Sequence, residues 1–389
     1  MVISSSLNVP YAILLSMKSH QSLPDRFTEI DLLRFLSALA VAFFHYTFHG
    51  FYPFTPSVSD WFPRLSAIAK YGFLGFHLFF IISGFVILMT ALGKTPRQFV
   101  ISRVVRLYPA YWFCCTLSFI LILMLGRGIF SVSFPQWALN MTMLQGFFKV
   151  PNIDGVYWTL FIEIKFYLFI FLLIVFRQIR RIHVYLGIWL ALSAVSACHP
   201  IHKLDALIIP EFSAYFIAGA AFFLIYKEGI DVYKTLLLLG SLLLALYRGW
   251  EYAILASEQF LTVFKPGIIL GCICLFYLIF LFIALRKTSF IRSRFFIFLG
   301  SLTYPFYLIH QDLGLIIFKL EHAFFDPHVL LGVTLILMLM VTWLIHSKIE
   351  KQYSPELKKA LEKNLDFSWL RFKLNRLAFS TNDIDKPAP

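Results

Sequence analysis

The chain has 389 residues, of which 59% are hydrophobic and only 14% are charged, and its formal net charge is +13. A soluble protein carries about a quarter charged residues, so this chain has too few charges to cover a soluble surface of its own size. The composition excludes a soluble enzyme, a disordered chain and a disulfide scaffold. It predicts a polytopic membrane protein. Its basic residues are spread between apolar segments, so we expect no nucleic-acid partner.

Apolar segments recur along the chain at lengths that suit a bilayer. A spanning helix needs about 20 mostly apolar residues, and about ten segments qualify. They are 29–49, 72–92, 109–126, 156–176, 182–198, 210–226, 233–248, 266–286, 296–319 and 328–347. The shorter apolar stretch 134–148 predicts an interfacial or re-entrant piece. The fold class that follows is an all-α transmembrane helix bundle.

Lys and Arg are concentrated in the even-numbered loops of that count. Because positive charge is retained on the cytoplasmic side, these loops and both termini are predicted to be cytoplasmic. Residues 27–348 then form one transmembrane domain. It lies between an N-terminal leader, 1–26, and a basic tail, 349–389, that is cytoplasmic or interfacial. Within the tail, Ser354-Pro355-Glu356 predicts a helix start.

Ionisable residues inside the apolar segments indicate functional sites, because burying a charge in a bilayer is costly. In the first segment Arg34 precedes His45 by eleven residues. That spacing puts both side chains on one helix face, about 16 Å apart along the axis. Each also has an ordinary interpretation. Arg34 could be a flanking residue that reaches the interface, and His45 a hydrogen-bonded core histidine.

Arg103 and Arg106 stand just before the third segment, whose helix start is predicted at Pro109. At a spacing of three residues on a helix they point the same way. Two guanidinium groups on one face form a fork for a phosphate-rich ligand. The alternative interpretation is that they only set the membrane orientation.

A carboxylate and further histidines occur in other segments. Glu163 lies in the fourth segment, His77 in the second and His310 in the ninth. An unpaired carboxylate at this depth needs a cation or hydrogen bond from another helix, which could also be purely structural. In the second segment, Ser83-Gly84 favours close approach of two helices and, as a second interpretation, a substrate contact. Together these residues suggest a polar path with a cationic inner mouth and an imidazole and carboxylate centre.

The motifs, taken in order, resemble those of the acyltransferase-3 family of bacterial integral membrane acyltransferases. Residues 29–45 are similar to its opening helix, with Arg and His at the same separation. Residues 75–85 are similar to its Gly-Val-Asp-Leu-Phe-Phe-x-x-Ser-Gly-Phe segment. Residues 103–109 resemble its Arg-x-x-Arg motif, 158–167 its Trp-Ser-Leu-x-x-Glu-x-x-Phe-Tyr motif, and 301–310 its Ser-Tyr-x-x-Tyr-Leu-x-His segment. The chain departs from the family pattern at His77, where many members have Asp, and at Lys165, where many have Gln.

The resemblance implies transfer of an acyl group, most often acetyl, from cytoplasmic acyl-coenzyme A to a hydroxyl of a lipid-linked or exported glycan. It implies a location in the bacterial inner membrane, among membrane lipids. It carries over Arg34 and His45, Arg103 and Arg106, and Glu163 as the functional residues.

The mechanism that we expect places the donor phosphates on Arg103 and Arg106, with a contribution from Arg34. His45 acts as general base or briefly carries the acyl group, Glu163 orients or charges it, and His310 is an auxiliary donor. No metal is expected, because thioester acyl transfer needs a base and an oxyanion donor.

Two alternatives remain open at this point. A proton-coupled transporter or flippase of a glycan precursor would use intramembrane His, Glu and Lys equally well. However, the sequence lacks the paired broken segments of repeat-built transporters. A non-catalytic partner in a polysaccharide assembly complex is the third possibility.

Overall fold

The computed structural model describes residues 26–50, 58–126, 130–200, 202–288 and 290–365. Almost all of the predicted leader, and the tail after residue 365, lie outside these ranges. The described residues form helices and connecting segments without strands, so the all-α prediction is confirmed. The main helices are α2 (Thr28–Phe44), α5 (Leu74–Ala91), α6 (Pro96–Leu125), α8 (Tyr157–Val175), α9 (Ile182–Cys198), α11 (Ser213–Glu228), α12 (Val232–Gln259), α13 (Pro266–Ala284), α14 (Arg294–Glu321), α15 (Pro327–Ile345) and α16 (Lys351–Asn364).

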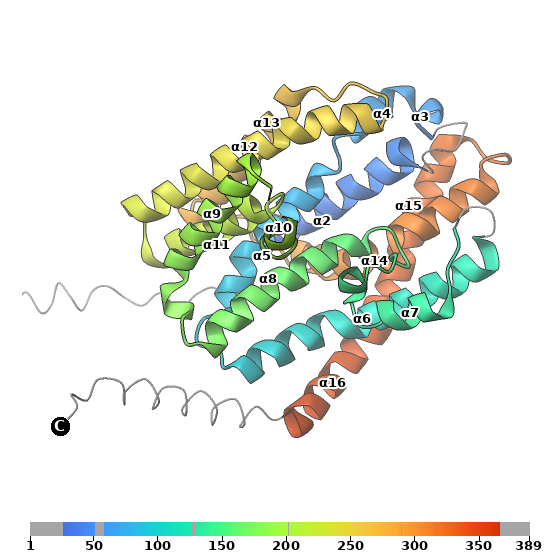
Figure 1. Ribbon diagram of the computed structural model, residues 1–389. Coiled ribbons are helices and arrows are strands. Elements are labelled where there is room, and N and C mark those ends of the chain that lie inside the picture. The colour runs from blue at the N-terminus through green and yellow to red at the C-terminus, as the bar shows by residue number, and fades with distance from the viewer. Residues whose placement is uncertain (1–25, 51–57, 127–129, 201, 289, 366–389) are drawn as a thin grey trace, which may run out of the picture.

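Shorter helices fill the connections (Figure 1). They are η1 (His45–His49), α3 (Val58–Trp61), α4 (Pro63–Ala69), α7 (Phe134–Asn140), η2 (Gln145–Phe148), η3 (Ile179–Arg181), α10 (His202–Ile208) and η4 (His346–Glu350). The stretch 134–148 forms α7 and η2, each too short to span a bilayer, as the prediction of an interfacial or re-entrant piece requires.

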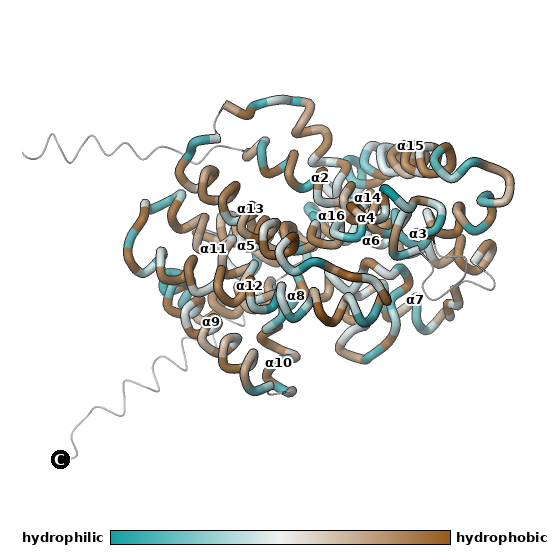
Figure 2. Tube along the Cα trace, turned by 90° about the horizontal axis from the view of Figure 1, so that it is seen from above, coloured by the Kyte–Doolittle hydropathy of each residue, from teal (hydrophilic) through white to brown (hydrophobic). Residues whose placement is uncertain are grey.

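Eight helical segments in the described part of the chain are long and apolar enough to cross a membrane. Two predicted spans are not among them. Segment 210–226 forms α11, which has only 16 residues. Segment 296–319 lies in α14, whose middle carries the polar run His310-Gln311-Asp312. The membrane bundle is thus confirmed, while the count of ten and the side on which the termini lie stay predictions. Figure 2 shows apolar residues along most helices and hydrophilic residues gathered in the connections.

Two helix starts that the sequence predicts at prolines are wrong. α6 begins at Pro96, where Thr95 and Gln98 form a capping box, and it continues through Pro109. The cap is the stronger start signal, and a proline inside a transmembrane helix is tolerated where neighbouring groups satisfy the freed carbonyl. Likewise, no helix starts at Pro355. The chain is helical from Pro327 to Asn364, because η4 joins α15 to α16 without a break.

The central packing pairs α5 with α11 and α14 with α2. At the first interface, a Cβ on Gly84 would collide with the carbonyl oxygen of Phe216, and one on Gly219 with that of Ile81. The two backbones therefore approach more closely than any side chain would permit. This confirms the close helix approach predicted at Ser83-Gly84.

Buried apolar side chains form two clusters, one around each of these helix pairs. One is built mainly from α5, α8, α9, α11, α12 and α13, and the other mainly from α2, α6, α14 and α15. Side chains from both clusters contribute walls to one polar cavity.

Candidate active site

Five helices, α2, α5, α6, α8 and α14, surround a cavity of about 290 Å³. Its apolar walls come from α5, α6 and α8. Its polar lining consists of Arg34, Ser83, Arg103, Arg106, Thr159, Glu163, Tyr167, Thr303, Tyr304 and Tyr307. Four of the residues selected from the sequence, the three arginines and Glu163, therefore meet in one place although they lie on three helices.

The arginines give the cavity its charge. Arg34 on α2 is repelled by Arg106 and attracted by Asp31 and Glu163. Arg103 and Arg106 project from the same face of α6, as their spacing indicated. The Arg103 guanidinium lies 5.9 Å from the Tyr167 ring centre, and that of Arg106 lies 5.6 Å from the Tyr304 ring centre. Within the described ranges Arg34 and Arg103 form no salt bridge, so the cavity favours an anionic ligand.

Glu163 lies with these arginines. The Ser83 hydroxyl donates a hydrogen bond of 2.5 Å to its Oε1, which links α5 to α8. Ser83 therefore lines the cavity while its neighbour Gly84 lets α11 approach. The Lys165 ammonium group, as its position on the helix indicated, does not pair with Glu163 and instead lies 4.5 Å from the Phe161 ring centre.

The histidines form a separate group. The rings of His45 and His310 are 5.4 Å apart, and His49 lies 5.3 Å from His45 across the π-helical turn η1. His45 and His310 are buried, but neither is among the residues that line the cavity. His77 is in neither group. Its ring stacks on that of Phe76, with the ring centres 4.3 Å apart, and it does not line the cavity. His77 is therefore not part of the polar path that the sequence predicted.

Tyr307 lies between the cavity and the imidazoles. Its hydroxyl is 2.9 Å from the Thr159 hydroxyl inside the cavity, while its ring centre is 5.4 Å from that of His310. One turn further along α14, His310 Nδ1 lies 2.9 Å from the Tyr307 carbonyl oxygen. A carbonyl only accepts hydrogen bonds, so Nδ1 of the neutral ring carries the proton and Nε2 keeps its lone pair.

Each of the two neighbouring imidazoles, His45 and His310, has a buried ring nitrogen without a hydrogen-bond partner in the described part of the protein. These nitrogens are His310 Nε2 and His45 Nδ1, and both are inaccessible to solvent. Buried polar atoms are normally hydrogen-bonded, so these nitrogens are candidates for contact with a substrate. Tyr46, the residue after His45, donates a 2.5 Å hydrogen bond to the His310 carbonyl and fixes α14 against η1.

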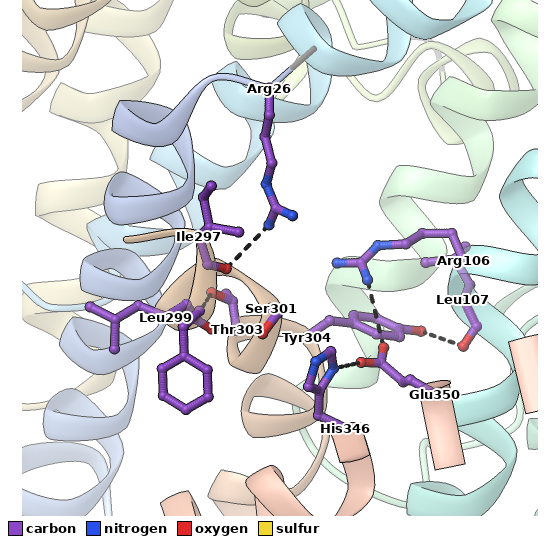
Figure 3. Close-up of polar contacts among 11 residues, drawn as sticks. Arg26, Arg106, Leu107, Ile297, Leu299, Ser301, Thr303, Tyr304, His346 and Glu350 are labelled. Carbon is purple, nitrogen blue, oxygen red and sulfur yellow. Dashed lines mark hydrogen bonds and ion pairs between the residues drawn. The ribbon is translucent and has the colours of Figure 1, made fainter. Parts of the chain in front are cut away.

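Glu350 is a site residue that sequence reasoning missed. It is 8% exposed, its Oε1 is 3.6 Å from Arg106 Nη1, and its Oε2 is 2.7 Å from His346 Nδ1. Figure 3 shows this carboxylate between Arg106 and His346, beside Tyr304. Its partner on α6 is 244 residues away in sequence, and the spacing of four to His346 is too common on helices to signal a site.

A second missed feature is a carboxyl pair behind His310. Asp154, in the connection before α8, is fully buried, and its Oδ2 accepts a hydrogen bond from the Asp312 backbone N–H. Burial, together with the Asp312 carboxyl, raises the pKa of Asp154. Asp154 also accepts from Val156 N–H, so it anchors the start of α8 to α14.

No group of three or more His, Cys, Asp or Glu side chains in the described ranges could hold a metal ion. The five cysteines are free.

These features define a multi-pass membrane protein with a cationic cavity inside its bundle and buried imidazoles beside it. The chain belongs to the acyltransferase-3 family, since the family model described as an acyltransferase domain matches residues 27–347. No curated protein and no solved structure is significantly similar to the chain.

Proposed function

We propose that this protein is an O-acyltransferase of the bacterial inner membrane. It moves an acyl group, most often acetyl, from acyl-coenzyme A that enters from the cytoplasm to a hydroxyl of a cell-surface or exported glycan. The observation that carries this proposal is the meeting of Arg34, Arg103 and Arg106 around one cavity in a chain of this family. Incompletely paired guanidinium groups suit a phosphorylated, anionic donor.

The donor side of the reaction uses the cavity. Arg103 and Arg106 attract the anionic donor, and the apolar walls of α5 and α8 accommodate its acyl-bearing arm. Glu163, held by Ser83, balances part of the positive charge of Arg34. This role differs from the one expected from the sequence, because Glu163 lies with the arginines and not with the imidazoles.

The acceptor side uses the imidazoles. An imidazole nitrogen with a free lone pair takes the proton of the acceptor hydroxyl, as general base, while that oxygen forms a bond to the acyl carbon. The carbon–sulfur bond of the thioester breaks, and the departing thiolate takes up the proton. His45 is the proposed base and His310 assists it. In its neutral form His310 can accept a proton at Nε2, and it becomes a donor there once protonated.

The test is acyl transfer by the purified protein in nanodiscs, with radiolabelled acetyl-coenzyme A and membrane glycans as acceptors. We expect release of free thiol with incorporation of label, and a loss of about a hundredfold or more in His45→Ala, the usual scale for a general base. His183→Ala removes an exposed imidazole on α9 and should retain full activity.

If the His45→Ala variant inserts correctly and incorporates label at the wild-type level, His45 is not the base. Absence of transfer by the wild-type protein, with donor-independent uptake of a glycan precursor into vesicles, would instead favour the transporter.

A further inference from the structure

A second cavity lies next to the first, in a groove between the beginning of α6 and α16. Its volume is about 600 Å³. It is lined by Lys94, Arg97, Gln98, Ile101, Ser102, Val105, Lys358 and Glu362. We refer to these residues as the α6–α16 groove. In Figure 1, α16 leaves the bundle beside the first turns of α6.

The groove is positively charged. Three cations, Lys94, Arg97 and Lys358, face a single carboxylate, Glu362, which lies 3.8 Å from the Lys358 ammonium group. Within the described ranges Lys94 forms no salt bridge. Burial, with repulsion from Arg103 and Lys358, lowers the pKa of Lys94. An anion entering the groove would relieve this repulsion between cations.

One wall of the groove is fixed in place. The Arg97 guanidinium donates hydrogen bonds to the carbonyl oxygens of Leu365, at 2.7 Å, and of Glu362. Glu362 lies in the last turn of α16 and Leu365 directly follows the helix, where backbone carbonyl oxygens have no helical partner. Arg97 therefore attaches the end of α16 to α6, which leaves Lys94 and Lys358 as the cations available to a ligand.

The groove and the cavity are neighbours on α6. Ser102 lines the groove and Arg103 lines the cavity, and their side chains are joined by a 3.3 Å hydrogen bond from Arg103 Nε. On a helix, Arg106 lies one turn beyond Ser102, on the border between the two faces. Positive charge thus continues for about 14 Å along α6, from Arg97 to Arg106, and Lys94 extends it just before the helix begins.

The sizes of the two spaces indicate how they share a ligand. Pockets for drug-sized ligands measure about 300–1,000 Å³, so the 290 Å³ cavity suits a small molecule or one arm of a large one. Acyl-coenzyme A is large, with a slender acyl-bearing arm at one end and a pyrophosphate and a 3′-phosphate at the other. Its phosphorylated end needs a cationic space outside the cavity.

We propose that the α6–α16 groove, together with the adjoining Arg103 and Arg106, binds the phosphate groups at the nucleotide end of the acyl-coenzyme A donor, while the apolar part of the cavity receives the acyl-bearing arm. The inference rests on the proposed function. It assigns Lys94 and Lys358 to donor recognition, and neither residue belongs to the motifs that resemble the family.

Binding and turnover test the inference separately. The probe for binding is adenosine 3′,5′-bisphosphate, titrated calorimetrically into the full chain in phosphatidylcholine nanodiscs. We expect the double variant Lys94→Ala/Lys358→Ala to weaken its binding about tenfold or more. The control is Lys359→Ala, which removes an exposed lysine of α16 that lies outside the groove, and it should retain the wild-type affinity.

Turnover is compared with two donors, acetyl-coenzyme A and S-acetylpantetheine, which carries the same thioester arm without the phosphates. The double variant should raise KM for acetyl-coenzyme A about tenfold and leave both kcat and the KM for S-acetylpantetheine unchanged. An equal loss with both donors, or equal bisphosphate affinity in the double variant and the control, would overturn the inference. Bisphosphate binding that depends on Lys94 and Lys358, without turnover of either donor, would support the groove and refute the proposed function.

An anionic lipid headgroup offers the same phosphate chemistry. The titration is therefore repeated in nanodiscs that contain phosphatidylglycerol. If the bisphosphate does not bind and the double variant instead loses co-purifying phosphatidylglycerol, the groove is a lipid site and the inference is wrong.

Discussion

Glu350 contacts two side chains beside the cavity, Arg106 and His346, and Arg106 in turn lies over Tyr304. Arginine has many rotamers, and holding one of them has an entropic cost that a fixed partner reduces. The carboxylate therefore positions Arg106, the residue proposed to meet the donor. Since the Arg106 side chain is 42% exposed, solvent screens this ion pair and its contribution is modest.

We expect Glu350→Gln to raise KM for acetyl-coenzyme A about fivefold, or ~1 kcal/mol, with kcat within about twofold of wild type. Glu356→Gln, an exposed change on α16, is the matched control. Steady-state kinetics with varied donor measure both effects. An unchanged KM in Glu350→Gln would show that Arg106 needs no such support.

Helical spacing explains which site residues could be recognised in the sequence. Arg103 and Arg106 could be recognised from their spacing of three residues, which puts both on one helix face. Glu163 could be recognised because a carboxylate in an apolar segment is rare. Tyr307 and Glu350 gave no such signal. A tyrosine suits the membrane interface in any helix, and the role of Glu350 depends on a contact between chain segments far apart in sequence.

At the scale of helices, the interface of α5 with α11 fixes the position of one cavity wall. Gly84 packs against α11, and the preceding residue on α5, Ser83, lines the cavity. Gly219 on α11 faces the Ile81 carbonyl with no space for a methyl group. Gly332 on α15 has open space around its Cβ position, so it is a natural comparison.

We expect Gly219→Ala to force α5 and α11 apart and to destabilise the fold by about 2 kcal/mol or more, as overpacking does. Gly332→Ala should be neutral or stabilise by up to about 1 kcal/mol, since alanine favours helix. Thermal unfolding of the two variants in detergent, followed by intrinsic fluorescence, compares them. A midpoint for Gly219→Ala at or above that of Gly332→Ala would contradict the expected collision.

The helices themselves were predictable because long apolar runs are unambiguous, whereas their ends were not. Pro109 reads as a helix start by propensity, yet it lies inside α6 because the cap at Thr95 begins the helix earlier. Pro355 reads the same way, yet η4 carries the helix from α15 into α16. Local propensity is overridden where packing and a better cap favour continuation.

For the whole molecule, the basic loops predict that the α6–α16 groove and the loop after α9 lie on opposite sides of the membrane. Cys198 is an exposed native thiol at the end of α9. Lys359 is exposed on α16. The two positions therefore report the orientation directly.

We expect a membrane-impermeant maleimide to label Cys198 in spheroplasts, and to label Lys359→Cys in a Cys198→Ser background only after lysis. Mass spectrometry of the purified protein identifies the labelled site. Labelling of Lys359→Cys before lysis would show that the orientation is opposite to the predicted one. The groove would then face away from cytoplasmic donors.

The contact of Tyr307 with Thr159 has a consequence for the membrane as an electrical insulator. The proposed function takes one reactant from each side of the membrane, and a protein that does so risks becoming a channel for water and ions. Here two hydroxyl-bearing side chains meet at 2.9 Å and separate the arginine cavity from the imidazoles. In the proposed reaction, a displacement of the Tyr307 ring would let a small acyl group pass. We therefore expect the cell to keep its proton gradient while the enzyme turns over.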